Sequence, residues 1–356
     1  MSSSPWKVIG ASGFVGSAIL ARLRAEGTEA DPIEAPRLST HATDAKTLIK
    51  EARRLEAIID SLADSFAGAE VVINASGLAA PSQQDLAPLV GANALLPAVI
   101  AIAAQRTGIK RLIHMSSAAV QGNVEVLDST PVTQPFSAYS FSKALGEEVL
   151  LNLERFINKQ AAAGAAPGSA HSDFPAAPAS APATVAPHHA LELCIVRATS
   201  VMGRGRRTTE AFARFASSPL ASVAAGNHRT PIASNYALAE FTVKVGAFDG
   251  HLPSIVLQPW EGATAKSVLV DAGRRLPLQI PVSIARAAVA AGYAISEALG
   301  DRFQAPVRRI ELMWFGQDQD DSWAQEHQLI PTPRVSEVLR DAHTALGKKQ
   351  DARFTS

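Results

Sequence analysis

The sequence predicts an α/β protein built on a doubly wound parallel sheet, with a smaller, mainly helical second lobe. Two observations carry this prediction. In the first half, short β-branched runs alternate with stretches of helical apolar spacing, which is typical of a parallel sheet covered by helices on both faces. After Ser200 helical stretches dominate. The chain has 356 residues, enough for one large domain and a modest second lobe.

The strands of the sheet differ in how clearly the sequence defines them. Pro32 lies inside the second strand, between Gly27 and Leu38, and implies a short or bulged strand because proline donates no ladder hydrogen bond. The helical spacing over 43–67 leaves 38–42 for one further short strand. A late strand at 254–258 belongs either to the second lobe or to the main sheet. Four strands are well defined: 6–9, 71–74, 111–115 and 193–197.

Composition excludes several classes of partner and chemistry. Basic and acidic side chains number 33 each, so the chain lacks the long-range field with which nucleic-acid binders attract phosphates, and we expect neither nucleic acid nor a membrane as partner. The single cysteine, Cys194, allows no intramolecular disulfide and no cysteine cluster. The first five residues contain no secretory signal pattern. We therefore expect a cytoplasmic protein.

Two segments invite other interpretations. Residues 282–299 are apolar but shorter than the roughly 20 residues of a membrane span and contain Arg286 and Glu297, so we predict a packed amphipathic helix. Residues 161–190 are rich in Ala and Pro, and we predict a flexible insert. Its His188-His189 pair has no carboxylate or thiolate nearby at ligand spacing, so we predict no metal site.

A glycine-rich turn follows the first strand and opens a helix, the context of a dinucleotide-binding turn. Gly10 permits the tight turn, Gly13 allows close approach of a pyrophosphate, and Gly16 lets the helix pack on the strand. The alternative is a turn without a ligand. We predict a Rossmann-type domain with these cofactor-binding residues in its first turn: Gly10, Ser12, Gly13, Phe14, Val15 and Gly16.

The end of the second strand bears on the choice of cofactor. Glu34 lies 18 residues beyond Gly16, near the position at which an acidic residue accepts the ribose hydroxyls of NAD. Its carboxylate would repel the 2′-phosphate of NADP. Arg37, three residues later, would support NADP. We predict NAD and keep NADP as the alternative.

Tyr139 and Lys143 stand at i and i+4 in a helical stretch and therefore share one face. A nearby cation favours the phenolate and lowers the pKa of a tyrosine toward neutrality, so the pair would shuttle a proton. The alternative for an isolated match is a packed ring beside a solvated lysine.

Other polar groups follow the strands at the edge of the sheet that carries the glycine turn. Ser116 and Ser117 end the strand at 111–115, and Asn93 enters the next helix after the strand at 71–74. Because ligands bind at the carboxyl ends of parallel strands, we expect these groups near cofactor and substrate. The small turn after residues 71–73 adds Asn74, Ala75, Ser76 and Gly77 to the predicted cofactor site.

Taken in order, six motifs resemble the extended short-chain dehydrogenase/reductase family, in its NAD-dependent epimerase/dehydratase, nucleotide-sugar group. The resemblance covers about residues 6 to 260. The motifs are GASGFVG, VINASG, the asparagine of GANALL, HMSSAAVQG, YSFSK and RATSVMGRG.

The resemblance implies reversible hydride transfer between a nicotinamide and a sugar carbon. Ser117 would hold the reacting oxygen, with Ser116 in support. Tyr139 would be the acid/base, and Lys143 its partner and a ligand of the nicotinamide ribose. The last motif leads into the substrate lobe, where we expect Thr199, Arg204, Arg206 and Arg207 to bind substrate, the arginines pairing with a diphosphate.

The sequence departs from the family pattern at several points. Gln121 stands in place of the tyrosine of V-Y-G, and Ala198 in place of the proline after Arg197. The acidic residue usually found near the adenine is not identifiable. These departures leave the Ser-Tyr-Lys set intact but leave the identity of the substrate open. The choice among epimerase, dehydratase and reductase also stays open.

The predicted organisation has residues 1–200 as the NAD(P)-binding domain and 201–356 as mainly the substrate lobe and C-terminal helices, with a discontinuous boundary. The resemblance also implies a homodimer, paired through the helices that bear Asn93 and Tyr139. Two other functions stay open. One is a dehydrogenase or reductase of a steroid-like or small carbonyl substrate, and the other is a cofactor-binding scaffold without catalysis.

Overall fold

The computed structural model describes residues 6–79, 85–164, 191–300 and 303–354. The chain forms two compact units, both discontinuous in sequence. The first unit comprises Met1–Met115, Ser142–Ile195 and Gly246–Ser254, and the second comprises Ser116–Phe141, Val196–Val245 and Ile255–Ser356. The predicted functional division at residue 200 stays a prediction. Of the predicted insert, residues 161–164 end a helix, while 165–190, with His188 and His189, lie outside the described residues.

A six-stranded parallel sheet forms the centre of the fold, with strand order β10-β6-β4-β3-β1-β2. The four well-defined strands of the sequence prediction are all confirmed, and the late strand is β10 of this same sheet. β1 pairs in parallel with β2 and with β3, and β3 pairs with β4. The strands are β1 (Trp6–Ile9), β2 (Ala30–Ile33), β3 (Val71–Asn74), β4 (Arg111–Ser117), β6 (Glu192–Ala198) and β10 (Ile255–Leu257).

The predicted short second strand is confirmed, whereas the strand predicted at 38–42 is wrong. β2 has four residues and lies at the edge of the sheet. Pro32 has no N–H to donate, and it is tolerated there because an edge strand has a partner on one side only. Residues 34–43 contain no strand. The backbone N–H of Thr40 donates instead to Ala87 O at 3.2 Å, and its side chain bonds Glu51, so this segment runs along helices.

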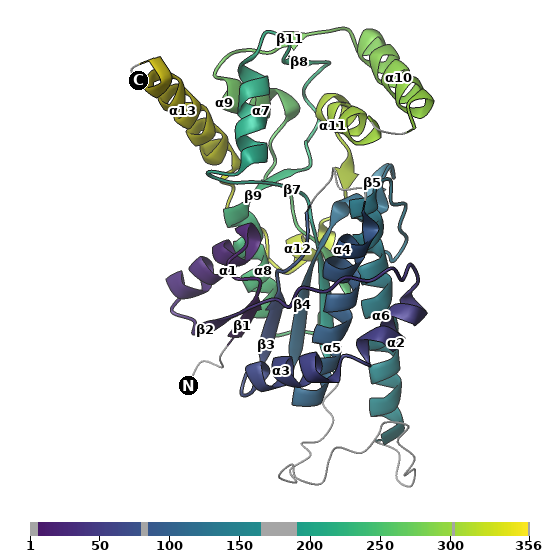
Figure 1. The fold of residues 1–356 in the computed structure, drawn as a ribbon. Helices are drawn as coiled ribbons and strands as arrows, with labels where there is room; N and C mark the ends of the chain where they lie inside the picture. Colours follow the sequence, from purple (N-terminus) through teal and green to yellow (C-terminus); the bar gives the residue numbers. More distant parts are fainter. Residues whose placement is uncertain (1–5, 80–84, 165–190, 301–302, 355–356) are drawn as a thin grey trace. The chain divides into compact units, whose positions relative to one another are not determined.

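Helices cover both faces of the sheet in the first unit (Figure 1). The chain winds one way from β1 to β2 and the other way from β3 to β4, so right-handed crossovers place α1 on one face and α5 on the other. The strand order reverses between β1 and β3, which is where ligands bind in such sheets. The helices are α1 (Phe14–Ala25), α2 (Ala45–Ala52), α3 (Glu56–Phe66), α4 (Leu86–Val90), the π-helical turn Gly91–Leu95, α5 (Leu96–Thr107) and α6 (Ala138–Gly164).

One continuous helical run, Leu86–Thr107, is long and apolar enough to cross a membrane by length and composition. Its apolar window is 83% buried within the structure. α2 and α3 pack against α5 from outside the sheet. The run is therefore accounted for as a core helix of the first unit.

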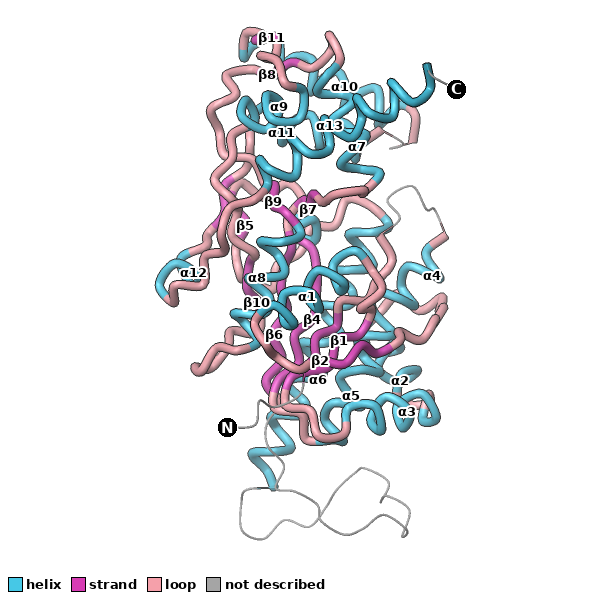
Figure 2. Tube along the Cα trace, turned by 90° about the vertical axis from the view of Figure 1, so that its left-hand side faces the viewer, coloured by secondary structure: helices cyan, strands magenta, loops and turns pink. Residues whose placement is uncertain are grey.

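The second unit combines short strand pairs with helices (Figure 2). Its strand pairs are β7 (Ser200–Met202) with β9 (Ile232–Ser234), β8 (Ser222–Val223) with β11 (Leu278–Gln279), and β5 (Val126–Leu127) with β12 (Asp318–Gln319). A short 3-10 turn spans Ala118–Gln121. The helices are α7 (Arg207–Ser217), α8 (Asn235–Gly246), which ends one residue beyond the unit, α9 (Ala265–Gly273), α10 (Val282–Ala298), α11 (Gln304–Phe315), α12 (Ser322–Glu326) and α13 (Val335–Phe354).

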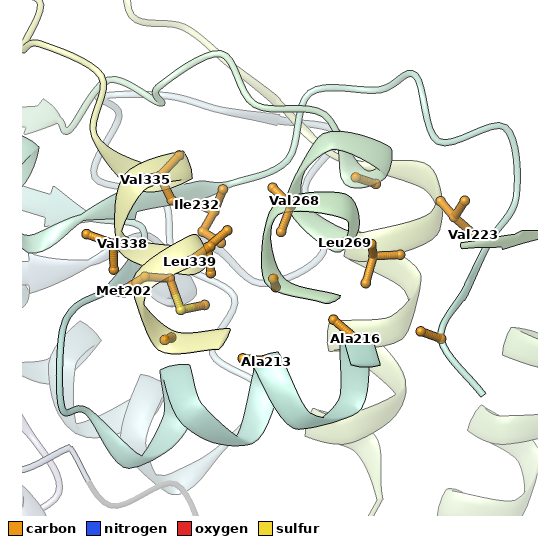
Figure 3. Packing of buried hydrophobic residues seen from close by; sticks show 14 residues of the cluster. Met202, Ala213, Ala216, Val223, Ile232, Val268, Leu269, Val335, Val338 and Leu339 are labelled. Atoms are coloured by element: carbon orange, nitrogen blue, oxygen red, sulfur yellow. The ribbon is translucent and has the colours of Figure 1, made fainter. Parts of the chain in front are cut away.

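The core of the second unit lies where α7, α9 and α13 pack together beside the β7–β9 pair (Figure 3). Ala213 and Ala216 of α7 and Ala272 of α9 belong to this cluster, and their small side chains allow close helix contact. A capping box between Thr264 and Ser267 starts α9.

Candidate functional site

The turn between β1 and α1 requires glycine at two positions. Gly10 has φ +76°, and a Cβ there would lie 2.8 Å from the backbone of Ser76. A Cβ on Gly16 would lie 2.2 Å from Gly10 O. The roles that the sequence suggested for these two glycines, a tight turn and close packing, therefore agree with the geometry.

The same turn leaves room for a phosphate group. A Cβ on Gly13 would meet Gly10 O at 3.1 Å and no other heavy atom within 4 Å, so the space in front of this residue is open. Gly13 is the N-cap residue of α1, it carries no side chain to cap the helix, and the first turn contains no acidic residue. Ser12 beside it is exposed. These residues fit a dinucleotide pyrophosphate at a helix N-terminus.

The acidic candidate for ribose binding lies next to this turn. The backbone N–H of Gly10 donates to Ile33 O at 3.1 Å, and Glu34 is the next residue after Ile33. Glu34 and Arg37 are both exposed. Glu34 thus directly follows a residue that is hydrogen-bonded to the glycine turn, and its role in ribose binding stays a prediction.

The turn after β3 is held by a buried hydrogen-bond chain. Asn74 Nδ2 lies 3.0 Å from His114 Nδ1 on the neighbouring strand. Asn74 Oδ1 accepts from the backbone N–H of Ser76 at 3.1 Å and from its hydroxyl. Because Ser76 touches Gly10, the amide of Asn74 sets the position of this wall of the predicted cofactor site.

His114 is a residue to which the sequence analysis gave no role. Since Asn74 Nδ2 can only donate, His114 Nδ1 accepts and the imidazole is neutral. Burial, together with the charge of Lys143, holds the pKa of His114 well below its usual range. The signal in the sequence was a histidine inside an otherwise apolar strand, which a core position explains equally well.

Asn93 is positioned by the π-helical turn and uses its whole amide within the protein. Its Oδ1 accepts from Leu78 N at 3.0 Å, and its Nδ2 donates to Leu78 O at 3.0 Å and to Ser142 Oγ at 2.9 Å. Asn93 is completely buried. Asn93 therefore connects the backbone after Gly77 to α6 and helps to shape the predicted cofactor site without leaving its amide available to a ligand.

Lys143 is buried in the same unit. Its ammonium donates to Met115 O at 2.8 Å. A Cβ on Gly77, whose φ is +149°, would come within 3.0 Å of Lys143 Nζ and 2.8 Å of Asn93 Oδ1. Burial lowers the pKa of Lys143 to about 8, while Glu147 acts in the opposite direction. A side chain at Gly77 would therefore crowd the Asn93 amide and the Lys143 ammonium.

Ser117, Tyr139 and Arg206 form a cluster in the second unit. Ser117 hydrogen-bonds the Tyr139 phenol. Burial raises the pKa of Tyr139, and both the Ser117 hydrogen bond and the positive charge of Arg206 act to lower it. The sequence led us to expect a phenol pKa below its usual value. In the structure burial outweighs the two stabilising groups, and the pKa lies above it.

The other predicted substrate residues are placed differently. Arg204 is exposed and pairs with Glu337 at 2.9 Å and Asp341 at 2.5 Å, both in α13. Thr199 Oγ1 donates to Pro231 O at 2.5 Å. Arg207 is exposed at the start of α7, and Ser116 is buried. Of the three arginines, the structure brings Arg206 to Tyr139 and attaches Arg204 to α13.

Gln121, which departs from the family pattern, has a structural role. Its Nε2 donates to Asp128 Oδ1 at 2.7 Å, and its Oε1 accepts from Asp128 N at 3.0 Å. Arg197 Nη1 donates to Asp128 O at 2.9 Å and to Thr130 O at 2.8 Å. The buried amide thus fixes the loop at 128–130.

The fold and the glycine turn define a dinucleotide-binding protein of the Rossmann class. Residues 6–164 match the model of the NAD dependent epimerase/dehydratase family. The match covers less than half of the chain, and this segment is similar to that family. No curated protein matches the sequence.

Solved structures share the fold at low sequence identity. The structure titled gox2253 is 16% identical, with a TM-score of 0.63 over 97% of this chain and 98% of its own. UDP-glucuronic acid 4-epimerase from Bacillus cereus in complex with NAD is 15% identical, with a TM-score of 0.59 over 94% of each chain. MoeE5 in complex with UDP-glucose and NAD is 16% identical, with a TM-score of 0.52 over 78% of this chain and 84% of its own.

Proposed function

We propose that this protein is an epimerase/dehydratase-type oxidoreductase that binds NAD and acts on a nucleotide-linked sugar. The observation that carries the proposal is the hydrogen bond between Ser117 and the Tyr139 phenol, with Lys143 one turn further along the same helix. The family of residues 6–164 supports the cofactor. The cluster supports the reaction type.

NAD would be held by the first unit. The pyrophosphate would lie at the N-terminus of α1 over Gly13, and Glu34 would accept the hydroxyls of the adenosine ribose. Lys143 would donate to the nicotinamide ribose. The bound nicotinamide supplies an acceptor for a hydride from the substrate carbon and a donor for its return.

Tyr139 would take the proton of the substrate hydroxyl as its carbon is oxidised and return it on reduction. Ser117, already bonded to the phenol, would hold the same substrate oxygen. Arg206 stabilises the phenolate that forms, since its positive charge lowers the pKa of Tyr139. A positive group beside the phenol is what a tyrosine base buried in protein requires.

A nucleotide-linked sugar is favoured by the structural neighbours, which include the Bacillus cereus epimerase in complex with UDP-glucuronic acid and NAD at a TM-score of 0.57. A dehydrogenase or reductase of a steroid-like or small carbonyl substrate is the second candidate. One observation favours it: Arg204, predicted to pair with a diphosphate, is already paired with Glu337 and Asp341. The Ser117–Tyr139 hydrogen bond argues against a scaffold without catalysis.

Incubation with NAD and a panel of UDP- and dTDP-sugars tests this proposal, with products separated by chromatography. Thermal unfolding with UDP or dTDP distinguishes the two substrate classes, because a nucleotide that binds the native state raises the melting temperature. We expect turnover of at least one donor and protection by its nucleotide. Protection by neither nucleotide, with NAD binding retained, would favour the small-carbonyl alternative.

We infer a cytoplasmic location, which the single cysteine supports because it allows no intramolecular disulfide. A homodimer also stays a prediction. Pairing through the helix after Asn93 needs an exposed face, yet Leu96 to Ala104 of α5 are all buried within a single chain. A dimer would therefore need a different surface or a rearrangement of α2 and α3.

A further inference from the structure

α10 carries an apolar face that the described part of the protein does not cover. Ala285, Val289 and Ser296 are buried and mark the inner side of the helix, which packs against α11. At 100° per residue the opposite side consists of alanine, isoleucine and leucine with one serine. Ile284 and Ile295 on this outer side are each 57% exposed. Arg286 and Glu297 are the charged residues of α10, and the exposed apolar side lies between them and the packed side.

The exposed apolar surface extends beyond α10. Of the 15 large hydrophobic side chains that are exposed among the described residues, eight fall between positions 276 and 310. Leu276 and Leu278, beside the start of α10, are 75% and 64% exposed. We call these eight residues the α10 surface: Leu276, Leu278, Val282, Ile284, Ile295, Leu299, Phe303 and Ile310. An accumulation of exposed apolar side chains in one stretch of the chain is typical of an interaction site.

Basic side chains outnumber acidic ones around the α10 surface. Arg274 and Arg275 directly precede Leu276, and Arg309 precedes Ile310; all three are exposed. Arg286 of α10 lies on the other side of the helix from Ile284 and Ile295, over the ring of Phe315. The acidic residues among the described residues 274–300 and 303–311 are Glu297 and Glu311, and Glu311 pairs with Arg308. The balanced charge of the whole chain led us to expect no membrane partner, but this region departs locally from that balance.

This charge distribution decides between the candidates for the partner. A second copy of the same surface would bring arginines against arginines as well as apolar against apolar groups. An anionic phospholipid surface satisfies both features, because its headgroups attract the arginines and its acyl boundary accepts the apolar face. We propose that the α10 surface docks the second unit peripherally onto an anionic lipid bilayer.

The length and the packing of α10 fit a helix that lies on a membrane surface and does not cross the membrane. α10 has 17 residues, fewer than the roughly 20 that a spanning helix needs, and its inner side is already packed in the protein. Lying in the plane of the interface, it would insert Ile284 and Ile295, while Arg274 and Arg275 meet the headgroups. The contact would keep the enzyme beside membrane-bound substrates or products without altering its reaction.

Vesicle co-flotation of the full-length protein tests the proposal. The vesicles are phosphatidylcholine alone and phosphatidylcholine mixed with phosphatidylglycerol. We expect flotation with the anionic vesicles, at least tenfold less with phosphatidylcholine alone, and a loss of similar size in the Ile284→Glu/Ile295→Glu variant. Leu220→Glu is the matched control, because Leu220 is 79% exposed in the same unit but outside the α10 surface.

A second variant, Arg274→Glu/Arg275→Glu, leaves the apolar face intact and therefore measures the contribution of charge to vesicle binding separately. Each charge that contacts the lipid contributes about fivefold to binding. Circular dichroism shows whether each variant is folded. Absence of flotation for wild type, or equal flotation of wild type and Ile284→Glu/Ile295→Glu, would overturn the proposal. A wild-type dimer that this variant converts to a monomer, with no vesicle binding, would identify a second copy as the partner instead.

Discussion

The side-chain amide of Asn74 donates to Nδ1 of His114 over 3.0 Å, and both side chains are buried. This contact fixes which way the amide faces, so that its oxygen is left to hold Ser76 beside the glycine turn. It links the end of β3 to the middle of β4, beside the point where the strand order reverses between β1 and β3. The shape of the predicted NAD site therefore depends on a residue that would not touch NAD.

Replacing His114 with phenylalanine should weaken both folding and NAD binding. The change leaves Asn74 Nδ2 as a buried donor without an acceptor, which costs about 1–3 kcal/mol. His114→Gln, whose side-chain oxygen can accept the hydrogen, should restore part of the affinity. NAD titration calorimetry and urea unfolding measure the two effects; unchanged affinity in both variants would show that the contact does not shape the site.

The same histidine predicts acid lability. Because the native pKa of His114 lies well below the ordinary 6.5, the unfolded chain takes up a proton below that pH while the native protein does not. Stability present above pH 6.5 is lost as pH falls toward the native pKa, at up to about 1.4 kcal/mol per pH unit. Urea unfolding of His114→Gln from pH 7 to 5 should show a shallower decline than wild type, and parallel curves would contradict this.

Two glycine substitutions should separate folding from cofactor binding. Gly16→Ala places its methyl group 2.2 Å from Gly10 O and should destabilise the protein by more than about 1–3 kcal/mol. Gly13→Ala should remain folded and lose at least tenfold in NAD affinity, because its methyl group points into the open space for the phosphates. Gly347→Ala, with no atom within 4 Å in α13, is the control. Full NAD affinity in Gly13→Ala would move the pyrophosphate elsewhere.

Arg206 and Arg207 are neighbours with different expected effects. Arg206→Met removes the positive charge that lowers the pKa of Tyr139, so the pH limb of kcat that reports this phenol should move upward and activity at pH 7 should fall. Arg207→Met, an exposed position, should leave the pH profile unchanged. Matching profiles for wild type and Arg206→Met would remove Arg206 from the site.

The titration of Lys143 should make the affinity for NAD fall at alkaline pH. Its pKa is lowered to about 8 in the native protein, so above that pH the ammonium becomes neutral and its bond to the ribose weakens. The native protein then binds fewer protons than the unfolded chain up to about pH 10.5, and stability rises with pH across this window. NAD affinity measured from pH 6 to 10 should decline above about 8 in wild type. A pH-independent affinity would contradict the role of Lys143.

The sequence predicted most of the first unit because its signals are local. The β-branched run at Trp6–Ile9 and the glycines after it specify a strand and a turn whatever lies around them. The error at residues 38–42 arose because strand pairing depends on a distant partner, and Thr40 finds Ala87 on a helix instead of a strand.

The residues of the site were predicted better than their roles. Tyr139 and Lys143 follow from their spacing, but spacing does not show that burial raises the phenol pKa or that Arg206 supplies a positive charge to it. Likewise, the sequence predicted that Asn93 lies near the cofactor. It did not predict that the Asn93 amide makes its hydrogen bonds with Leu78 and Ser142. Burial and hydrogen-bond partners are properties of the folded chain, and no spacing encodes them.

The rate of sugar conversion by Tyr139→Phe, compared with wild type on the same nucleotide-sugar and with NAD saturating, tests the central claim most directly. The phenylalanine keeps the ring and removes the proton carrier. The account predicts a fall in kcat of about 10²–10⁴-fold with unchanged NAD affinity. A wild-type enzyme that binds NAD but converts no member of the panel, or a Tyr139→Phe variant as active as wild type, would contradict it.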